Sequence, residues 1–182
     1  GEVLKSIDGG HTWITVVREN RDKVMDIIVD PYEPRIIYIG TAKSGILKSV
    51  DGGLSWNDLG AGLKSYTGSH EYRQLVYLPA TKNNLVLISK FGLLRTVDGG
   101  GNWQVMELLP ASKTTNILAL AVNPQNSDEI YYTTSASLVK TTDGGLKWSS
   151  KQLPFKQRLT SGIFVSPAEP LQVYLTTKLL KN

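Results

Sequence analysis

The sequence contains no cysteine, which excludes disulfide bridges and thiolate metal sites. It has two histidines, His11 and His70, too far apart in the sequence to predict a histidine-rich metal site. No apolar run approaches the ~20 residues of a membrane-spanning helix, and we find no signal peptide and no helical period. The net charge of +4 is small for 182 residues, so only the distribution of charge can be informative.

What the chain does have is one motif, Ser/Thr-x-Asp-Gly-Gly-x-x-Trp, written four times, at 6–13, 49–56, 96–103 and 141–148. Its aspartates and tryptophans are Asp8 and Trp13, Asp51 and Trp56, Asp98 and Trp103, and Asp143 and Trp148. Successive aspartates are 43, 47 and 45 residues apart. A period in this range is typical of repeat architectures, and one sheet per repeat of a propeller fits it.

The motif has a physical rationale of its own. Two glycines between short alternating runs predict a hairpin, because glycine reaches positive φ without a Cβ clash. The aspartate can accept hydrogen bonds from backbone N–H groups of that turn. We expect each tryptophan to bury its indole against the neighbouring sheet.

The pattern resembles the Asp-box, or bacterial neuraminidase (BNR), repeat of sialidases, xyloglucanase-like glycosidases, sortilin-type receptor domains and photosystem II assembly propellers. The resemblance implies an all-β fold, a β-propeller of four-stranded antiparallel blades with Asp-box hairpins. In that family the box lies between the third and fourth strands of a blade, away from the usual binding face. It therefore implies structural roles for the four aspartates and does not identify an activity.

Between the motifs the strand pattern repeats. It predicts strands at 25–29, 36–40, 46–49 and 55–59, then at 74–78, 85–89, 93–96 and 102–106, then at 117–122, 130–134, 138–141 and 147–151. We expect one domain over 1–182, with blades at about 1–17 (partial), 24–60, 73–108, 116–153 and 160–182 (partial). The last part would hold strands at 161–165, 172–176 and 179–181.

The partial blades at the two ends allow two completions. They could combine into one composite blade that closes a four-bladed ring and hides the sheet edges. Alternatively, the chain is a segment of a larger propeller.

In propellers, the loops from strand four to the next strand one and from strand two to strand three share the usual binding face. The segments predicted to form these loops contain eleven cations: Arg18, Arg21, Lys23, Lys43, Lys64, Arg73, Lys90, Lys113, Lys156, Arg158 and Lys178. Their acids are Glu19, Asp22 and Glu71, whereas most acids fall on the opposite face. A face of one sign attracts anionic partners. The alternative is that exposed loops are simply charged.

The longest loop, at 60–73, is also the richest in functional side chains. The candidate ligand-binding residues are Tyr66, His70, Glu71, Tyr72 and Arg73 in this loop, with Arg21, Lys43 and Arg158 from other loops. Tyrosine offers a flat apolar face with a hydroxyl, and arginine a forked donor. The alternative is a tolerated insertion. A basic column, Lys5, Lys48, Arg95, Lys140 and Lys181, is expected to neutralise aspartates or strand ends rather than to bind a ligand.

We therefore expect a non-catalytic binding propeller that presents a basic loop face to a protein, a peptide or an anionic glycan, with no cofactor, no metal and no catalytic residue. The alternative is a glycoside hydrolase. A sialidase-like site would need Arg18, Arg73 and Arg158 with Tyr72 and Glu71, but the Arg-Ile-Pro segment typical of sialidases is missing. A xyloglucanase-like site would need two opposed carboxylates on the loop face.

No aromatic-basic nucleic-acid motif is present, so we expect no nucleic-acid partner. The resemblance to surface-associated families favours a secreted, periplasmic or cell-surface location. The oligomeric state stays open.

Overall fold

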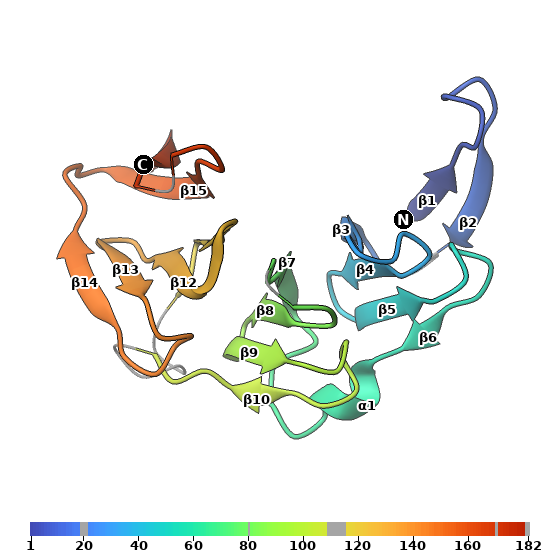
Figure 1. The fold of residues 1–182 in the computed structure, drawn as a ribbon, viewed down its shortest axis with the longest axis horizontal. Helices are drawn as coiled ribbons and strands as arrows, with labels where there is room; N and C mark the ends of the chain where they lie inside the picture. Colours follow the sequence, from blue (N-terminus) through green and yellow to red (C-terminus); the bar gives the residue numbers. More distant parts are fainter. Residues whose placement is uncertain (19–21, 80, 109–115, 170, 181–182) are drawn as a thin grey trace.

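The chain folds into five antiparallel sheets arranged in an arc (Figure 1). This computed structural model describes residues 1–18, 22–79, 81–108, 116–169 and 171–180. Three sheets have four strands and the two sheets at the ends of the arc have two. In chain order we number them sheets 1 to 5.

Sheet 1 consists of β1 (Glu2–Lys5) and β2 (Ile14–Arg18). Sheet 2 consists of β3 (Val24–Val29), β4 (Ile37–Thr41), β5 (Gly45–Ser49) and β6 (Asn57–Asp58). Sheet 3 follows the helix α1 (Gly60–Leu63) and consists of β7 (Tyr72–Tyr77), β8 (Leu85–Ser89), β9 (Gly92–Thr96) and β10 (Gln104–Val105). Sheet 4 consists of β11 (Ala119–Asn123), β12 (Asn126–Thr133), β13 (Ser137–Thr141) and β14 (Ser149–Gln152), and sheet 5 of β15 (Arg158–Val165) and β16 (Val173–Leu179).

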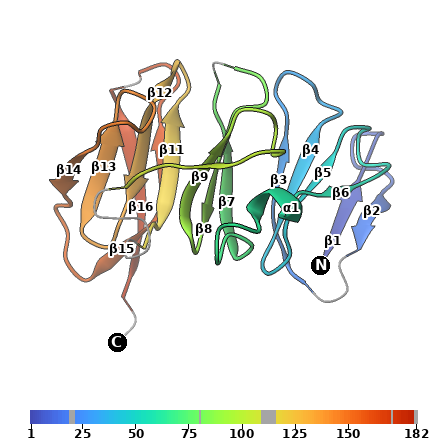
Figure 2. The same cartoon turned by 90° about the horizontal axis from the view of Figure 1, so that it is seen from below.

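Within each sheet, every strand pairs with the next one along the chain. Connections therefore alternate between the two ends of the sheets, as the edge-on view shows (Figure 2). One end carries the Asp-Gly-Gly turns. The other end, which we call the loop end, carries the β4–β5 and β8–β9 hairpins and the segments that lead into the next sheet.

The arc is open. Sheets 1 and 5 are separate sheets at its opposite ends (Figure 1). The closed four-bladed ring with a composite blade is therefore wrong for this chain, because the two half-sheets that would have to pair are apart.

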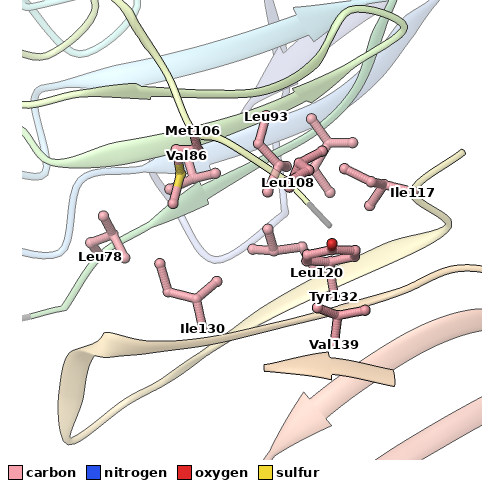
Figure 3. Packing of buried hydrophobic residues seen from close by; sticks show 11 residues of the cluster. Leu78, Val86, Leu93, Met106, Leu108, Ile117, Leu120, Ile130, Tyr132 and Val139 are labelled. Carbon is pink, nitrogen blue, oxygen red and sulfur yellow. The ribbon is translucent and has the colours of Figure 1, made fainter. Parts of the chain in front are cut away.

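The apolar core lies between neighbouring sheets rather than in one central mass. Figure 3 shows the cluster between sheets 3 and 4, where Leu78, Val86 and Leu93 face Ile130 and Tyr132. A second cluster joins sheets 2 and 3, and smaller ones join sheets 1 and 2 and sheets 4 and 5. Strand two of each four-stranded sheet carries this packing, and all five residues of β8 are buried. Stacking of sheets through such faces is what the alternating strand pattern favours.

The structure corrects three expectations about elements. A short helix, α1, begins the 60–73 loop where we expected none. The strand β16 continues through Thr177 and Lys178, where a two-to-three loop was predicted, because these residues pair with Thr160 and Leu159. Likewise, β7 begins at Tyr72 and β15 at Arg158, so strands extend into segments that the sequence assigns to loops.

Within the described residues, no helix has both the length and the apolar character that crossing a membrane requires.

Candidate functional site

The four Asp-Gly-Gly turns have the same hydrogen bonds. The hydroxyl of the first motif residue donates to the aspartate, as from Thr96 to Asp98 at 2.8 Å, and accepts the N–H of the second glycine. One carboxylate oxygen accepts the N–H four residues later, from Thr12, Ser55, Asn102 and Lys147, at 2.8–2.9 Å. Both glycines of every turn have positive φ, between 70° and 101°, which glycine adopts without strain.

These bonds stabilise the ionised carboxylates. The hydroxyl and N–H of Thr12 lower the pKa of Asp8 to about 2, and those of Ser55 hold the pKa of Asp51 far below its ordinary value. The pKa values of Asp98 and Asp143 are lowered in the same way, by Asn102 and by the N–H of Lys147. A carboxylate held in this way organises its turn and is a poor proton donor.

The tryptophans differ from one another. Trp103 is buried. The indoles of Trp56 and Trp148 each donate to a carbonyl at the end of the preceding sheet: Trp56 to Val16 at 3.1 Å, and Trp148 to Glu107 at 2.6 Å. Trp13 is 58% exposed and donates to the carbonyl of Gly10 in its own turn. The expectation that every indole packs on a neighbouring sheet is wrong for Trp13, because no described sheet lies beyond sheet 1.

The basic column ties neighbouring sheets together. Lys5 donates to the carbonyl of Gly52 at 2.7 Å and Lys48 to that of Gly99 at 3.0 Å. Arg95 lies 3.4 Å from the carbonyl of Gly144. In each case the acceptor is the first glycine of the next sheet's turn. We expected these cations to neutralise aspartates or strand ends, and that expectation did not include the contact with the next turn. The sequence does contain a signal for it, because a cation directly precedes the Ser or Thr of every motif.

The last described member of the column has a different partner. Lys140 forms an ion pair with Glu129, and its ammonium group lies 5.1 Å from the centre of the Tyr131 ring. The ion pair raises the pKa of Lys140. Lys181 lies outside the described residues.

A cavity of about 550 Å³ opens at the loop end of sheet 3. It is lined by the segment between α1 and β7 and by the β8–β9 hairpin: Ser65, Thr67, Gly68, His70, Glu71, Lys90 and Phe91. A second cavity of about 340 Å³ adjoins it, shares Thr67, Gly68 and His70, and reaches Gly45 of sheet 2 and Lys64. The two cavities form one hollow surface across sheets 2 and 3.

Of the predicted candidates, His70 and Glu71 lie in this surface. His70 is exposed and lines both cavities. Glu71 forms an ion pair with Lys90 at 2.7 Å, which lowers the pKa of its carboxyl. Lys90 and Phe91 were not among the candidates, although they follow strand two in the same repeat as the loop.

The two tyrosines are held by the fold. Tyr66 lines the smaller cavity, but its hydroxyl donates to the carbonyl of Trp103 at 2.5 Å and its ring packs edge-on against Phe91. Tyr72 is 4% exposed, and its hydroxyl donates to Asp26 at 3.1 Å. Burial, together with the charge of Asp26, raises the pKa of Tyr72 well above its ordinary value.

The basic candidates are spread along the arc. Arg73 lies on β7 and donates to the side chain of Asn116 and the carbonyl of Ile117. Arg158 lies on β15, where it lines a separate cavity of about 350 Å³. Lys43 is exposed on the β4–β5 hairpin. Arg21 lies outside the described residues.

Several cations of the loop end have no acidic partner. Among the described residues, Arg18 pairs with Glu2 and Lys90 with Glu71. The remaining cations of that end, in the part of the chain that the structure describes, form no ion pair: Lys23, Lys43, Lys64, Arg73, Lys156, Arg158 and Lys178.

The acids of this end are committed to other bonds. The carboxylate of Asp22 accepts the N–H groups of Lys23, Lys43 and Ser44, and its pKa is lowered to about 2 although partial burial opposes the shift. The loop end therefore carries an excess of unpaired positive charge. No group of three or more potential metal ligands occurs among the residues that the structure describes.

No family model and no curated protein matches the sequence. Solved structures do resemble the fold. An ancestral GH74 enzyme has a TM-score of 0.67 at 18% identity, over 84% of this chain and 21% of its own. The GH74 xyloglucanase from Xanthomonas campestris has a TM-score of 0.67 at 14% identity, over 94% of this chain and 32% of its own.

A third structure, YCF48 from Cyanidioschyzon merolae, has a TM-score of 0.52 at 22% identity, over 74% of this chain and 38% of its own. This chain thus spans a fifth to two fifths of the length of these relatives. Identities this low show the fold alone. With the open arc of antiparallel sheets, the comparisons show that the chain has the fold of a segment of a larger β-propeller.

Proposed function

We propose that this chain is a non-catalytic binding segment of an Asp-box propeller whose loop end takes an anionic partner, either an acidic protein or peptide segment or an anionic glycan. Each four-stranded sheet is then one blade, with boundaries near 24–60, 73–108 and 116–153, and 1–17 and 160–182 are partial blades. The observation that carries the proposal is the hollow surface at His70. Lys64 lines it, and Lys43 is two residues from Gly45 of its lining; neither cation forms an ion pair among the described residues.

The electrostatic argument is direct. A concave surface with unpaired charge of one sign concentrates ligands of the opposite sign and speeds their encounter. Phe91 and the polar groups of Ser65 and Thr67 supply apolar and hydrogen-bonding contacts inside the cavity. The candidate residues His70, Glu71, Lys43, Arg73 and Arg158 would contact or steer the partner.

Glycoside hydrolysis is the alternative, and the similarity to GH74 enzymes is what raises it. A glycosidase needs a carboxylic acid whose pKa is raised, so that it can protonate the leaving group. At the loop end, the pKa values of Glu71 and Asp22 are both lowered. Tyr72 is buried with a raised pKa, which is unsuited to a nucleophile.

A binding titration tests the proposal. We expect a heparin-derived oligosaccharide or a polyglutamate peptide to bind at low salt and to bind more weakly as salt rises from about 50 to 300 mM, because screening shortens the reach of exposed charges. The double variant Lys43→Ala/Lys64→Ala should weaken binding roughly fivefold, about 1 kcal/mol.

The matched control is Lys82→Ala/Lys147→Ala, which removes the same charge from exposed positions outside the hollow surface. The control should leave affinity within twofold of the parent. Equal losses in both variants, or binding that salt does not change, would contradict a site at the loop end.

Turnover of fluorogenic glycosides separates the two functions. We expect none. Hydrolysis by the parent chain that disappears in Glu71→Gln would overturn the non-catalytic proposal.

We further propose that the chain acts outside the cytoplasm, secreted, in the periplasm or at the cell surface. The Asp-box resemblance supports this, because the family includes secreted and surface-associated proteins. Fractionation of cells that express the full-length gene product with a terminal tag would test it, and recovery of the tag only with the cytoplasm would contradict it.

A further inference from the structure

The two sheets at the ends of the arc are complementary halves. In sheets 2 and 4, the Asp-Gly-Gly turn lies between the third and fourth strands, and β1 and β2 of sheet 1 flank such a turn. Sheet 5 holds a first and a second strand. The first strands of neighbouring sheets contact one another, as β7 and β11 do, and β15 contacts β11 in the same way. In every four-stranded sheet the second strand pairs with the third. Among the described residues, β16 and β1 have no such partner.

The register of the complete sheets shows how β16 and β1 would pair. In sheet 2, Val29 pairs with Ile37, and Tyr38, the next residue, pairs with Lys48. In sheet 5, Val165 pairs with Val173, so Tyr174 takes the place of Tyr38. Lys5 takes the place of Lys48, because each directly precedes its motif's serine.

A tyrosine–lysine pair marks this register. Tyr38 pairs with Lys48 and Tyr131 with Lys140, and the ammonium groups lie 5.3 and 5.1 Å from the ring centres. A cation at this distance over an aromatic face is attracted to the ring. Sheet 5 holds the tyrosine of such a pair, Tyr174, and sheet 1 holds the lysine.

The burial of the second strands indicates that β16 is unpartnered. Tyr38 is 1% exposed and Tyr131 4%, whereas Tyr174 is 57% exposed. Similarly, β4 and β8 are buried almost throughout, while β16 alternates between half-buried and exposed residues. An open edge with exposed apolar residues is a template for another strand.

The neighbouring residues agree with this register. With Tyr174 opposite Lys5, antiparallel pairing places the apolar Leu175 opposite Leu4, on the same face of the sheet. The pairing also brings the turn of sheet 1 of one copy next to sheet 4 of the other. Within one chain, the cation before a motif donates to the first glycine of the next sheet's turn, which is Gly52, Gly99 or Gly144. Across the two copies, Gly9 would be the corresponding acceptor for Lys140.

We propose that β16 of one copy of this chain pairs in antiparallel register with β1 of a second copy, so that the two half-sheets form one four-stranded sheet. The exposed indole of Trp13 would then pack on the end of sheet 4 of the other copy, as Trp56 packs on sheet 1. Two copies that pair at both ends hold six complete and two composite sheets. Eight sheets is within the range of about 4–8 blades known for propellers.

A disulfide cross-link tests the register. The chain has no cysteine, so introduced thiols have no background. Leu175 takes the place of Ile39 and Leu4 that of Leu47, and Ile39 pairs with Leu47. Cysteines directly opposite on paired strands lie within disulfide reach. A mixture of Leu4→Cys and Leu175→Cys chains should give a covalent dimer on mild oxidation.

The control mixture pairs Leu4→Cys with Lys178→Cys, which is out of register by three residues. It should cross-link at least tenfold more slowly. Equal rates in the two mixtures, or no cross-link at high protein concentration, would contradict the pairing.

Sedimentation gives an independent readout without introduced cysteines. The parent chain, of 20.0 kDa, should sediment as a species of twice that mass or more at high concentration. Tyr174→Ala should weaken association on the order of tenfold through loss of the ring and its cation contact. Because Tyr174 is exposed in the single chain, this variant should fold normally.

Leu54→Ala, at an exposed apolar position in the turn between β5 and β6, is the matched control and should not change association. A parent chain that stays at 20.0 kDa at all concentrations would contradict the proposal.

Discussion

At the scale of single residues, the Asp-Gly-Gly turns show how one carboxylate organises a hairpin. Each aspartate is held by a hydroxyl and by at least one backbone N–H, and its pKa is lowered as a result. The ionised form is the one that the fold stabilises. Since the folded pKa lies below the unfolded value of about 3.9, the contribution is present above that value and is lost as pH falls below it.

The aspartates therefore predict acid sensitivity. Asp98→Asn should lower the melting temperature at pH 7 and should lose less stability than the parent between pH 4 and pH 2, because the substituted turn has no carboxylate to protonate. Thermal unfolding at a series of pH values measures this. Glu169→Gln, at an exposed carboxylate, is the control and should follow the parent curve. Parallel curves for Asp98→Asn and the parent would contradict the account.

Gly40 is a residue that the neighbouring sheet requires. A Cβ built there would lie 2.0 Å from Cζ of the Tyr72 ring. Gly40→Ala should destabilise the chain by about 3 kcal/mol, measured by urea unfolding, because the ring cannot move out of its buried site without cost. In the double variant Gly40→Ala/Tyr72→Leu, the loss should be clearly smaller than the sum of the single losses. Additive losses would mean that the two residues do not compete for space.

At the scale of elements, neighbouring sheets are joined by a repeated set of contacts. An apolar cluster fills the space between them, and the cation before each of the first three motifs reaches the next turn. The indoles of Trp56 and Trp148 reach back in the opposite direction. The turns at Asp51, Asp98 and Asp143 thus serve both their own hairpins and the stacking of the sheets.

The cation contacts predict a measurable loss of stability. Lys48→Met should lower the free energy of unfolding by about 1 kcal/mol, since it leaves the carbonyl of Gly99 without its charged donor and keeps the apolar stem. Lys82→Met, at an exposed cation, should change it by less than about 0.5 kcal/mol. Equal effects of the two substitutions would contradict a role for Lys48 in joining sheets.

Much of the strand order could be predicted from the sequence, because the motif fixes the third hairpin of each repeat and the alternation fixes the rest. The helix α1 could not be predicted: its sequence, Gly60-Ala-Gly-Leu63, has two glycines and low helix propensity. Tyr72 and Arg73 were assigned to a loop because they follow a glycine-rich stretch, but their strand is set by pairing with β8.

The candidate site could be predicted only in part. The 60–73 loop does form a hollow surface, and His70 and Glu71 lie in it. The roles of Tyr66 and Tyr72 depend on Trp103 and Asp26, which are 37 and 46 residues away in sequence. The sequence alone contains no signal for such contacts, because they arise only when sheets stack.

At the scale of the whole molecule, the arc is most strongly packed in its middle. The clusters between sheets 2, 3 and 4 contain nine or more buried residues each, whereas the clusters that hold sheets 1 and 5 contain three each. Stability should therefore fall toward both ends of the arc.

Amide hydrogen exchange tests this gradient. At a concentration where the chain is monomeric, amides of β8 and β12 should exchange slowest, and those of β1, β2 and β16 at least a hundredfold faster. Uniform protection across the five sheets would show that the ends are held as firmly as the middle.

The two ends of the sheets differ in charge. Cations without ion pairs among the described residues lie at the loop end, where Lys64 lines the hollow surface, whereas the aspartates of the turns at the other end accept hydrogen bonds within their own turns. The most direct test is to map amide chemical-shift changes on an isotope-labelled chain titrated with polyglutamate peptide or heparin-derived oligosaccharide. We predict that the largest changes fall on 41–45, 64–73 and 90–92. Changes confined to the Asp-Gly-Gly turns, or none at saturating ligand, would contradict the account.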